Sequence, residues 1–168
     1  MPNSSKPKIV APPFDSAKVQ RKLCRGKALD LIGRREHSRL ELERKLASHF
    51  FEAELIGSTL DGLEDEGLLV ASRFVEDFIR GRALKGKGPV RIRAELLQRG
   101  IGERETKALL AVAEFDWLAL ASEVRAKRFG AESPENLGER ARQVRFLRYR
   151  GFETAQINAA LDLATDSD

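Results

Sequence analysis

The chain has 168 residues, of which 42% are hydrophobic and 33% charged, and this balance excludes a wholly disordered polyelectrolyte. The single cysteine, Cys24, excludes a disulfide framework and a thiolate metal cluster, and it indicates a reducing compartment. Lys and Arg number 30 against 26 Asp and Glu, and the resulting net charge of +4 excludes no class of partner until the charges are mapped.

The first 16 residues differ in composition from the rest of the chain. Four of the six prolines lie there, among Asn and Ser, and such a segment buries too little apolar surface to offset the entropy of ordering. We therefore predict a flexible tail over residues 1–16. Neither the tail nor the remainder contains the ~18 apolar residues of a membrane span, so we expect a cytoplasmic protein without a membrane partner.

From Ala17 onward the strong helix formers dominate, and no sustained period-two run of β-branched residues occurs. The sequence predicts an all-α fold with about nine helices. Ser38 stands three residues before a Glu, the pattern of a capping box at a helix start. Gly67 suits a left-handed helix end, and Pro89 suits the first turn of a new helix.

Internal repetition organises these helices, because three apolar positions recur at intervals of 50 and 51 residues. They are Leu46, Leu96 and Leu147; Phe51, Ile101 and Phe152; and Leu60, Leu110 and Leu161. Gly100 and Gly151 precede the large apolar residue in the later copies, whereas Phe50 stands there in the first. We predict three tandem three-helix repeats, over 17–68, 70–114 and 115–165, in an elongated and curved array. Units this small are expected to share packing with their neighbours.

The charges are segregated along the chain. Residues 80–104 hold eight basic and two acidic side chains, residues 125–150 hold eight and three, and residues 52–66 hold six acidic and no basic ones. Such patches suit phosphates or a complementary protein surface, although for any single Arg a solvated helix face is the favoured interpretation. Tyr149, between two arginines, is a candidate for stacking on a base or anchoring a partner, and a half-buried packing residue is the alternative. The predicted binding residues are Arg80, Arg82, Lys85, Lys87, Arg91, Arg93, Arg145, Arg148, Tyr149 and Arg150.

The sequence offers no catalytic constellation and implies no cofactor or metal. His37 and His49 are expected to be partly exposed rather than zinc ligands, and Cys24 to be a small, partly buried filler residue. Residues 81–88 match a phosphate-binding loop through its lysine, but Gly88 stands where Ser or Thr should ligate magnesium. No strand precedes this segment, so it is interpreted as a turn between helices.

Many stretches resemble the bacterial recombination regulator family RecX, in order and spacing over residues 17–163. They include Ala28-Leu-Asp-Leu-Ile32, Arg34-Arg-Glu-His-Ser38, Leu63-Glu-Asp-Glu-Gly-Leu-Leu69, Gly86-Lys-Gly-Pro89, Arg99-Gly-Ile101, Lys127-Arg-Phe129 and Arg145-Phe-Leu-Arg-Tyr-Arg-Gly-Phe152. Val70 and Ala71 depart from the family, which commonly has acidic residues there. Ser72 remains available as a helix N-cap.

The resemblance implies a non-enzymatic regulator of the RecA recombinase. Such proteins bind the RecA–DNA filament, usually in its groove, and suppress strand exchange, ATP hydrolysis and coprotease activity, which affects recombination, DNA repair and the SOS response. Single-stranded DNA would be contacted weakly or within the filament, and a monomer is expected. The alternative is a stand-alone DNA-binding protein, because three-helix units of this size resemble helix-turn-helix modules.

Overall fold

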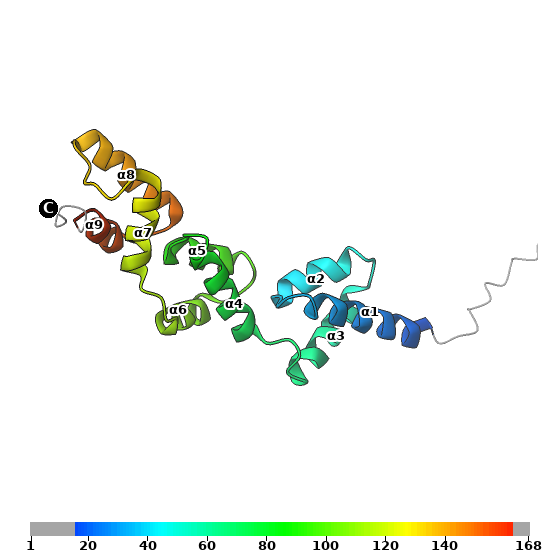
Figure 1. Ribbon diagram of the computed structural model, residues 1–168. Coiled ribbons are helices and arrows are strands. Elements are labelled where there is room, and N and C mark those ends of the chain that lie inside the picture. Colours follow the sequence, from blue (N-terminus) through cyan, green and yellow to red (C-terminus); the bar gives the residue numbers. More distant parts are fainter. Residues whose placement is uncertain (1–15, 163–168) are drawn as a thin grey trace, which may run out of the picture.

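The computed structural model describes residues 16–162, and within that range the chain forms helices and no strands (Figure 1). Repeat 1 contains α1 (Ser16–Ile32), α2 (Arg39–Ala47) and α3 (Ala53–Asp65); repeat 2 contains α4 (Ala71–Ala83), α5 (Pro89–Leu97) and α6 (Glu103–Val112); repeat 3 contains α7 (Trp117–Phe129), α8 (Leu137–Arg150) and α9 (Thr154–Asp162). The prediction of an all-α fold with three tandem three-helix repeats is confirmed. The predicted tail, apart from Ser16, lies outside the described residues.

Short polar side chains fix several helix starts. The Ser38 hydroxyl accepts a hydrogen bond from the Glu41 amide at 3.2 Å, as the capping-box pattern predicts. The side chains of Asp116 and Asn136 accept from amides in the first turns of α7 and α8. Pro89 is the first residue of α5, where its missing N–H group is harmless.

The expected cap of α4 is wrong. Val70 is the N-cap and makes no side-chain hydrogen bond there, whereas Ser72 lies inside the first turn. Burial of Phe74 and Val75, whose side chains enter the core of repeat 2, explains why the helix forms without a polar cap.

Each repeat has an apolar core of its own. Leu46, Leu96 and Leu147, the recurring leucines, are fully buried in the three separate clusters. Cys24, expected to be partly buried, is fully buried in the first cluster. Leu110, by contrast, is only partly buried. The buried members of the second core all belong to repeat 2, but Phe115 and Trp117, at the start of repeat 3, also pack against it, so these two repeats share apolar packing as expected.

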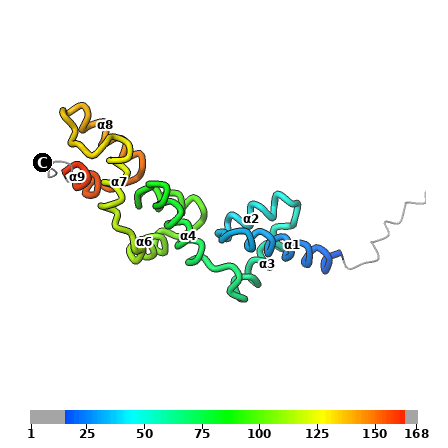
Figure 2. Tube along the Cα trace, viewed as in Figure 1, coloured from blue at the N-terminus to red at the C-terminus, as the bar shows by residue number. Residues whose placement is uncertain are grey.

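The repeats lie in one row, with repeat 2 in the middle and repeats 1 and 3 at opposite ends (Figure 2). The predicted elongated shape is therefore confirmed. In the part of the chain that the structure describes, no helix is both long and apolar enough to cross a membrane.

The second helix of each repeat ends in a left-handed residue. Gly100 and Gly151 have φ angles of +80° and +92°, and the amides that follow them donate back to Leu96 O and Leu147 O at 3.2 and 3.1 Å. Phe50, at the equivalent position of repeat 1, also has a positive φ, +64°, and its side chain is 95% exposed. A bulky residue in this conformation carries backbone strain.

The two glycines end their helices against the preceding repeat. A Cβ atom on Gly151 would overlap the backbone and side chain of Arg91 at the start of α5, and one on Gly100 would press on Leu40 at the start of α2. The end of the second helix in one repeat therefore lies on the start of the second helix in the repeat before it. Phe50 has no preceding repeat among the described residues, which explains how a large side chain fits there.

The two junctions are held differently. Repeat 3 joins repeat 2 through backbone hydrogen bonds, from Gly88 N–H to Arg150 O at 2.9 Å and from Val90 N–H to Gly151 O at 3.0 Å. Repeat 2 joins repeat 1 through ion pairs, Arg73–Glu36 at 3.0 Å and Arg99–Glu41 at 3.4 Å. Because salt screens side-chain ion pairs, the junction of repeats 1 and 2 is the more salt-sensitive of the two.

Substitution of Gly88 tests the junction of repeats 2 and 3. An added Cβ would overlap the carbonyl of Gly151, so we expect Gly88→Ala to lower the free energy of unfolding by about 1–3 kcal/mol and to expose the Val90 amide to hydrogen exchange. Gly102→Ala is a matched control, because Gly102 is also a helix N-cap with negative φ but has nothing within 4 Å of its Cβ position. Equal effects of the two substitutions in urea unfolding and hydrogen exchange would contradict the junction described here.

Substitution of Phe50 tests the strain at the end of α2. Glycine removes about 1–2 kcal/mol of left-handed strain and adds about 0.5–1 kcal/mol of unfolded-state entropy. Phe50→Gly should therefore raise the free energy of unfolding by about 0.5–1 kcal/mol, measured in urea. Phe50→Ala, which keeps the Cβ, should give no such gain. Destabilisation by glycine would show that the exposed ring stabilises the fold.

Candidate partner-binding surface

The structure divides the ten predicted binding residues into three groups. Lys85, Lys87, Arg91, Tyr149 and Arg150 lie around the contact of α8 with α5 and the turn before it, where repeat 3 meets repeat 2; Arg145 and Arg148 are exposed on α8; and Arg80, Arg82 and Arg93 lie elsewhere, Arg93 on a second groove between these two repeats. The structure thus brings five of the ten predicted residues together at one contact between repeats and leaves the other five outside it.

Arg91 links the two repeats. Its Nη1 donates to Tyr149 O at 3.1 Å, its guanidinium carbon lies 5.2 Å from the centre of the Tyr149 ring, and its Nε pairs with Glu95 at 3.0 Å. The hydrogen bond to the Glu95 carboxylate is the largest of the causes that raise the pKa of the Arg91 guanidinium. Arg91 therefore positions Tyr149, and the Glu95 carboxylate partly neutralises the charge of Arg91.

Arg150 makes the reciprocal contact. Its Nη1 donates to Lys85 O at 3.0 Å, and its guanidinium carbon lies 5.1 Å from the centre of the Phe146 ring. Burial lowers the pKa of the half-buried Lys87 ammonium, and the cations of Arg91 and Arg150 lower it further. The junction is consequently electropositive, and an anion placed there would relieve repulsion among these groups.

Arg82 faces a different cluster. It pairs with Glu95 at 2.7 Å, and its guanidinium carbon lies 4.8 Å from the centre of the Phe78 ring, with Arg99 at 4.6 Å from the same ring. Because Glu95 also binds Arg91, one carboxylate connects this cluster to the junction of repeats 2 and 3. Arg82 is thus a structural cation.

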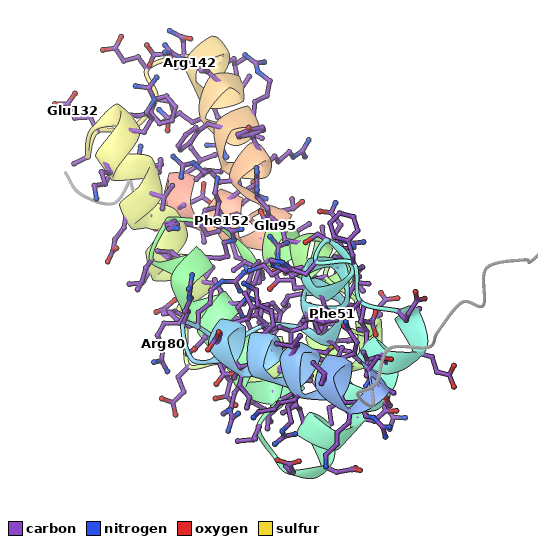
Figure 3. All side chains as sticks on the ribbon, turned by 90° about the vertical axis from the view of Figure 1, so that its right-hand side faces the viewer. Phe51, Arg80, Glu95, Glu132, Arg142 and Phe152 are labelled. Carbon is purple, nitrogen blue, oxygen red and sulfur yellow. The ribbon has the colours of Figure 1, made fainter. Side chains whose placement is uncertain are left out.

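The remaining two predicted residues of repeat 2 do not join the cluster around Lys87. Arg80 is exposed, and Figure 3 shows it at an edge of the molecule, apart from Glu95. Arg93 lines a second groove between repeats 2 and 3, with Lys107 of α6 and Trp117 of α7.

Arg145, Arg148 and Tyr149 are the exposed members on α8. Tyr149 is 72% exposed although Arg91 lies over its ring. The described residues offer no hydrogen-bond or ion-pair partner to Arg145 or Arg148. Arg145 and Arg148 are therefore available to another molecule without breaking any such contact, and Tyr149 is largely exposed beside its contact with Arg91.

The basic stretch over residues 125–150 also contains a buried cation, Arg125, which the charge pattern of the sequence does not distinguish from the exposed ones. Arg125 is 3% exposed and donates to Ala131 O, Glu132 O and Gln143 Oε1 at 2.8 to 3.1 Å. Burial lowers the pKa of its guanidinium. Arg125 therefore holds the loop before α8, and Figure 3 places Glu132 of this loop at the far end of repeat 3 from Phe152.

His37 corrects the expectation that both histidines are partly exposed. Its side chain is buried, with Nδ1 2.9 Å from Arg35 O and Nε2 2.9 Å from Lys45 Nζ, so the neutral ring donates to the carbonyl and accepts from the ammonium. Burial lowers the pKa of the imidazole. His49 is exposed, as expected.

A row of three-helix domains without strands among the described residues defines an all-α repeat protein. Comparison with known proteins identifies the family. Models of the first, second and third three-helix domains of RecX match residues 24–63, 72–109 and 114–161. Regulatory protein RecX of Halorhodospira halophila is 45% identical over 144 residues, 86% of this chain and 89% of that protein. The Pseudomonas entomophila protein of the same name is 46% identical over 134 residues, 80% of this chain and 86% of that one.

Solved structures agree on the fold. The crystal structure of RecX from Lactobacillus salivarius superposes with a TM-score of 0.75 at 19% identity, covering 88% of this chain and 98% of that one. A second crystal structure of a regulatory protein RecX gives 0.75 at 21% identity, covering 88% of this chain and 75% of that one. The chain belongs to the RecX family of regulatory proteins.

The lowered pKa of His37 predicts how stability depends on pH. The unfolded imidazole titrates near 6.5 and the folded one lower, so below about pH 6.5 the unfolded state binds more protons. Stability should be fully present above that pH and fall as the pH drops toward the folded pKa. Urea unfolding between pH 8 and 5 measures this, with His49→Gln as a control that keeps the decline and His37→Gln as a variant that removes its histidine component. An unchanged slope in His37→Gln would contradict the assignment.

Proposed function

We propose that this chain is a cytoplasmic, non-enzymatic regulator that binds the RecA–DNA filament as a monomer. It inhibits the recombinase, ATPase and coprotease activities of RecA and thereby modulates recombination, DNA repair and the SOS response. Membership of the RecX family and the family's implied action on RecA support this proposal. One observation supports a particular binding surface: Arg145, Arg148 and Tyr149 are exposed beside the electropositive junction of repeats 2 and 3.

The elongated row of repeats suits an extended partner. A chain lying along a groove contacts several filament subunits through weak, separate patches, and the effective concentration of the second and third patches multiplies their contribution. Backbone hydrogen bonds at the junction of repeats 2 and 3 keep these patches at a fixed spacing, so little entropy is lost on binding.

The exposed group on α8 provides two kinds of contact. Arg145 and Arg148 can pair with filament carboxylates or with DNA phosphates, and the ring of Tyr149 can stack on a base or fill an apolar pocket. Because Arg91 and Arg150 are engaged in the fold, they position Tyr149 and contribute to the potential at the junction. Binding through such charges is expected to weaken with salt.

Charge reversal on α8 tests this surface. Arg145→Glu combined with Arg148→Glu should raise the concentration needed for half-inhibition of RecA ATPase on single-stranded DNA at least tenfold, because attraction becomes repulsion. Arg104→Glu combined with Lys107→Glu is the matched control on α6, with the same change in charge at exposed positions. This control should shift the half-inhibition concentration less than twofold. Helicity by circular dichroism verifies folding of both variants.

Failure of the unmodified protein to inhibit at stoichiometric amounts would contradict the proposed function. Equal shifts in the two double variants would show that net charge matters and this surface does not. Fluorescence anisotropy on labelled DNA without RecA separates the alternative: we expect weak binding that falls steeply with salt, whereas tight, sequence-selective binding would indicate a stand-alone DNA-binding protein.

A further inference from the structure

A groove of about 490 Å³ lies beside the basic junction, between the turn after α4 and the helices α7 and α8. Its apolar lining comes from both repeats. Leu84 of the turn is 80% exposed, whereas Leu120, Val124 and Phe146 of repeat 3 are partly buried. An exposed leucine above a partly buried apolar floor leaves room for another apolar side chain.

The rim of this groove is basic. Lys85, Lys127, Arg128 and Arg150 line it together with a single acidic residue, Glu123. Lys85, Lys127 and Arg128 are exposed. The groove therefore combines an apolar interior with a net positive rim, which suits a ligand that is both apolar and acidic.

The junction fixes the shape of the groove. Gly86 has a φ of +67°, and a Cβ on it would lie 2.8 Å from Val124 Cγ2 and 3.5 Å from Arg150 Nη1. The turn thus lies directly on α7, and the Arg150–Lys85 hydrogen bond holds it from the other side. A groove held in this way is preorganised, which lowers the entropy lost when a ligand binds.

The apolar lining distinguishes between the classes of anion that the rim could attract. A nucleic acid would pair with the cations, but Leu84 and Val124 offer its bases no aromatic face for stacking, and the guanidinium of Arg150 already lies over the Phe146 ring. An extended or helical peptide with acidic side chains around one large apolar residue matches both features.

We propose that this groove binds an acidic segment of the protein partner, which inserts one large apolar side chain between Leu84 and Phe146. This inference rests on the proposed function for the identity of the partner as the filament protein, and it adds a peptide-binding site that is separate from the exposed α8 side chains. The cations of the rim orient the segment, and the apolar side chain supplies the specificity.

Two fluorescein-labelled probes test the groove on the full chain. One is an eight-residue peptide of Asp and Glu with a central Phe, and the other carries Ser in place of that Phe. Fluorescence anisotropy should show at least tenfold tighter binding of the Phe peptide. Leu84→Glu should weaken that peptide at least tenfold, whereas Leu137→Glu, at a leucine of similar exposure (85%) that does not line the groove, should change its binding less than twofold.

A paired charge variant checks the rim. Lys127→Glu combined with Arg128→Glu should weaken both peptides at least tenfold, and Arg104→Glu combined with Lys107→Glu should not. Equal binding of the Phe and Ser peptides, binding of neither, or displacement of both by lower concentrations of oligothymidylate would overturn the proposal. The last result would indicate a nucleic-acid site. RecA is absent from this assay, so its failure leaves the ATPase test of the proposed function independent.

Discussion

The backbone of α8 can reach the start of α5 because neither Gly88 nor Gly151 carries a side chain at the point of contact. Two amide–carbonyl hydrogen bonds follow from that approach, and they fix the position of repeat 3 on repeat 2. The clustering of Lys87, Arg91 and Arg150, the exposure of Tyr149 and the groove beside Gly86 all depend on it. The surface on which the function is proposed is therefore a product of backbone packing between repeats rather than of any single helix.

Net charge describes this molecule poorly, because its cations have two different uses. Arg82, Arg91 and Arg125 satisfy carboxylates, carbonyls and aromatic rings within the fold. Arg145 and Arg148 have no such contacts in the described part of the chain and stay available. A cation engaged in the fold and an exposed cation without a partner among the described residues can lie two residues apart on one helix, as Arg150 and Arg148 do, since nearby positions of a helix face different directions.

Sequence reasoning succeeded where the signal is local or periodic. The all-helical content, the cap at Ser38 and the recurrence of Leu46, Leu96 and Leu147 all follow from short-range chemistry and spacing. The three-repeat organisation followed from the same recurrence.

Sequence reasoning failed where the answer depends on contacts between distant segments. The burial of His37 against Lys45, and the use of Arg150 to bind the carbonyl of Lys85, are set by tertiary packing that no window of residues encodes. The Arg91–Glu95 pair could have been predicted from the sequence, since the spacing i, i+4 on a helix brings such residues together. The contact of Arg91 with Tyr149 in repeat 3 could not, because it depends on how the two repeats pack.

Phe50 sets a condition on how a row of such repeats can be extended. Repeats in this chain add to one another through a glycine at the end of the second helix, and repeat 1 carries phenylalanine at that position. A further unit could not pack there in the manner of the other two, because its backbone would meet the Cβ atom of Phe50. Adding a repeat on that side by design would therefore require Phe50→Gly first.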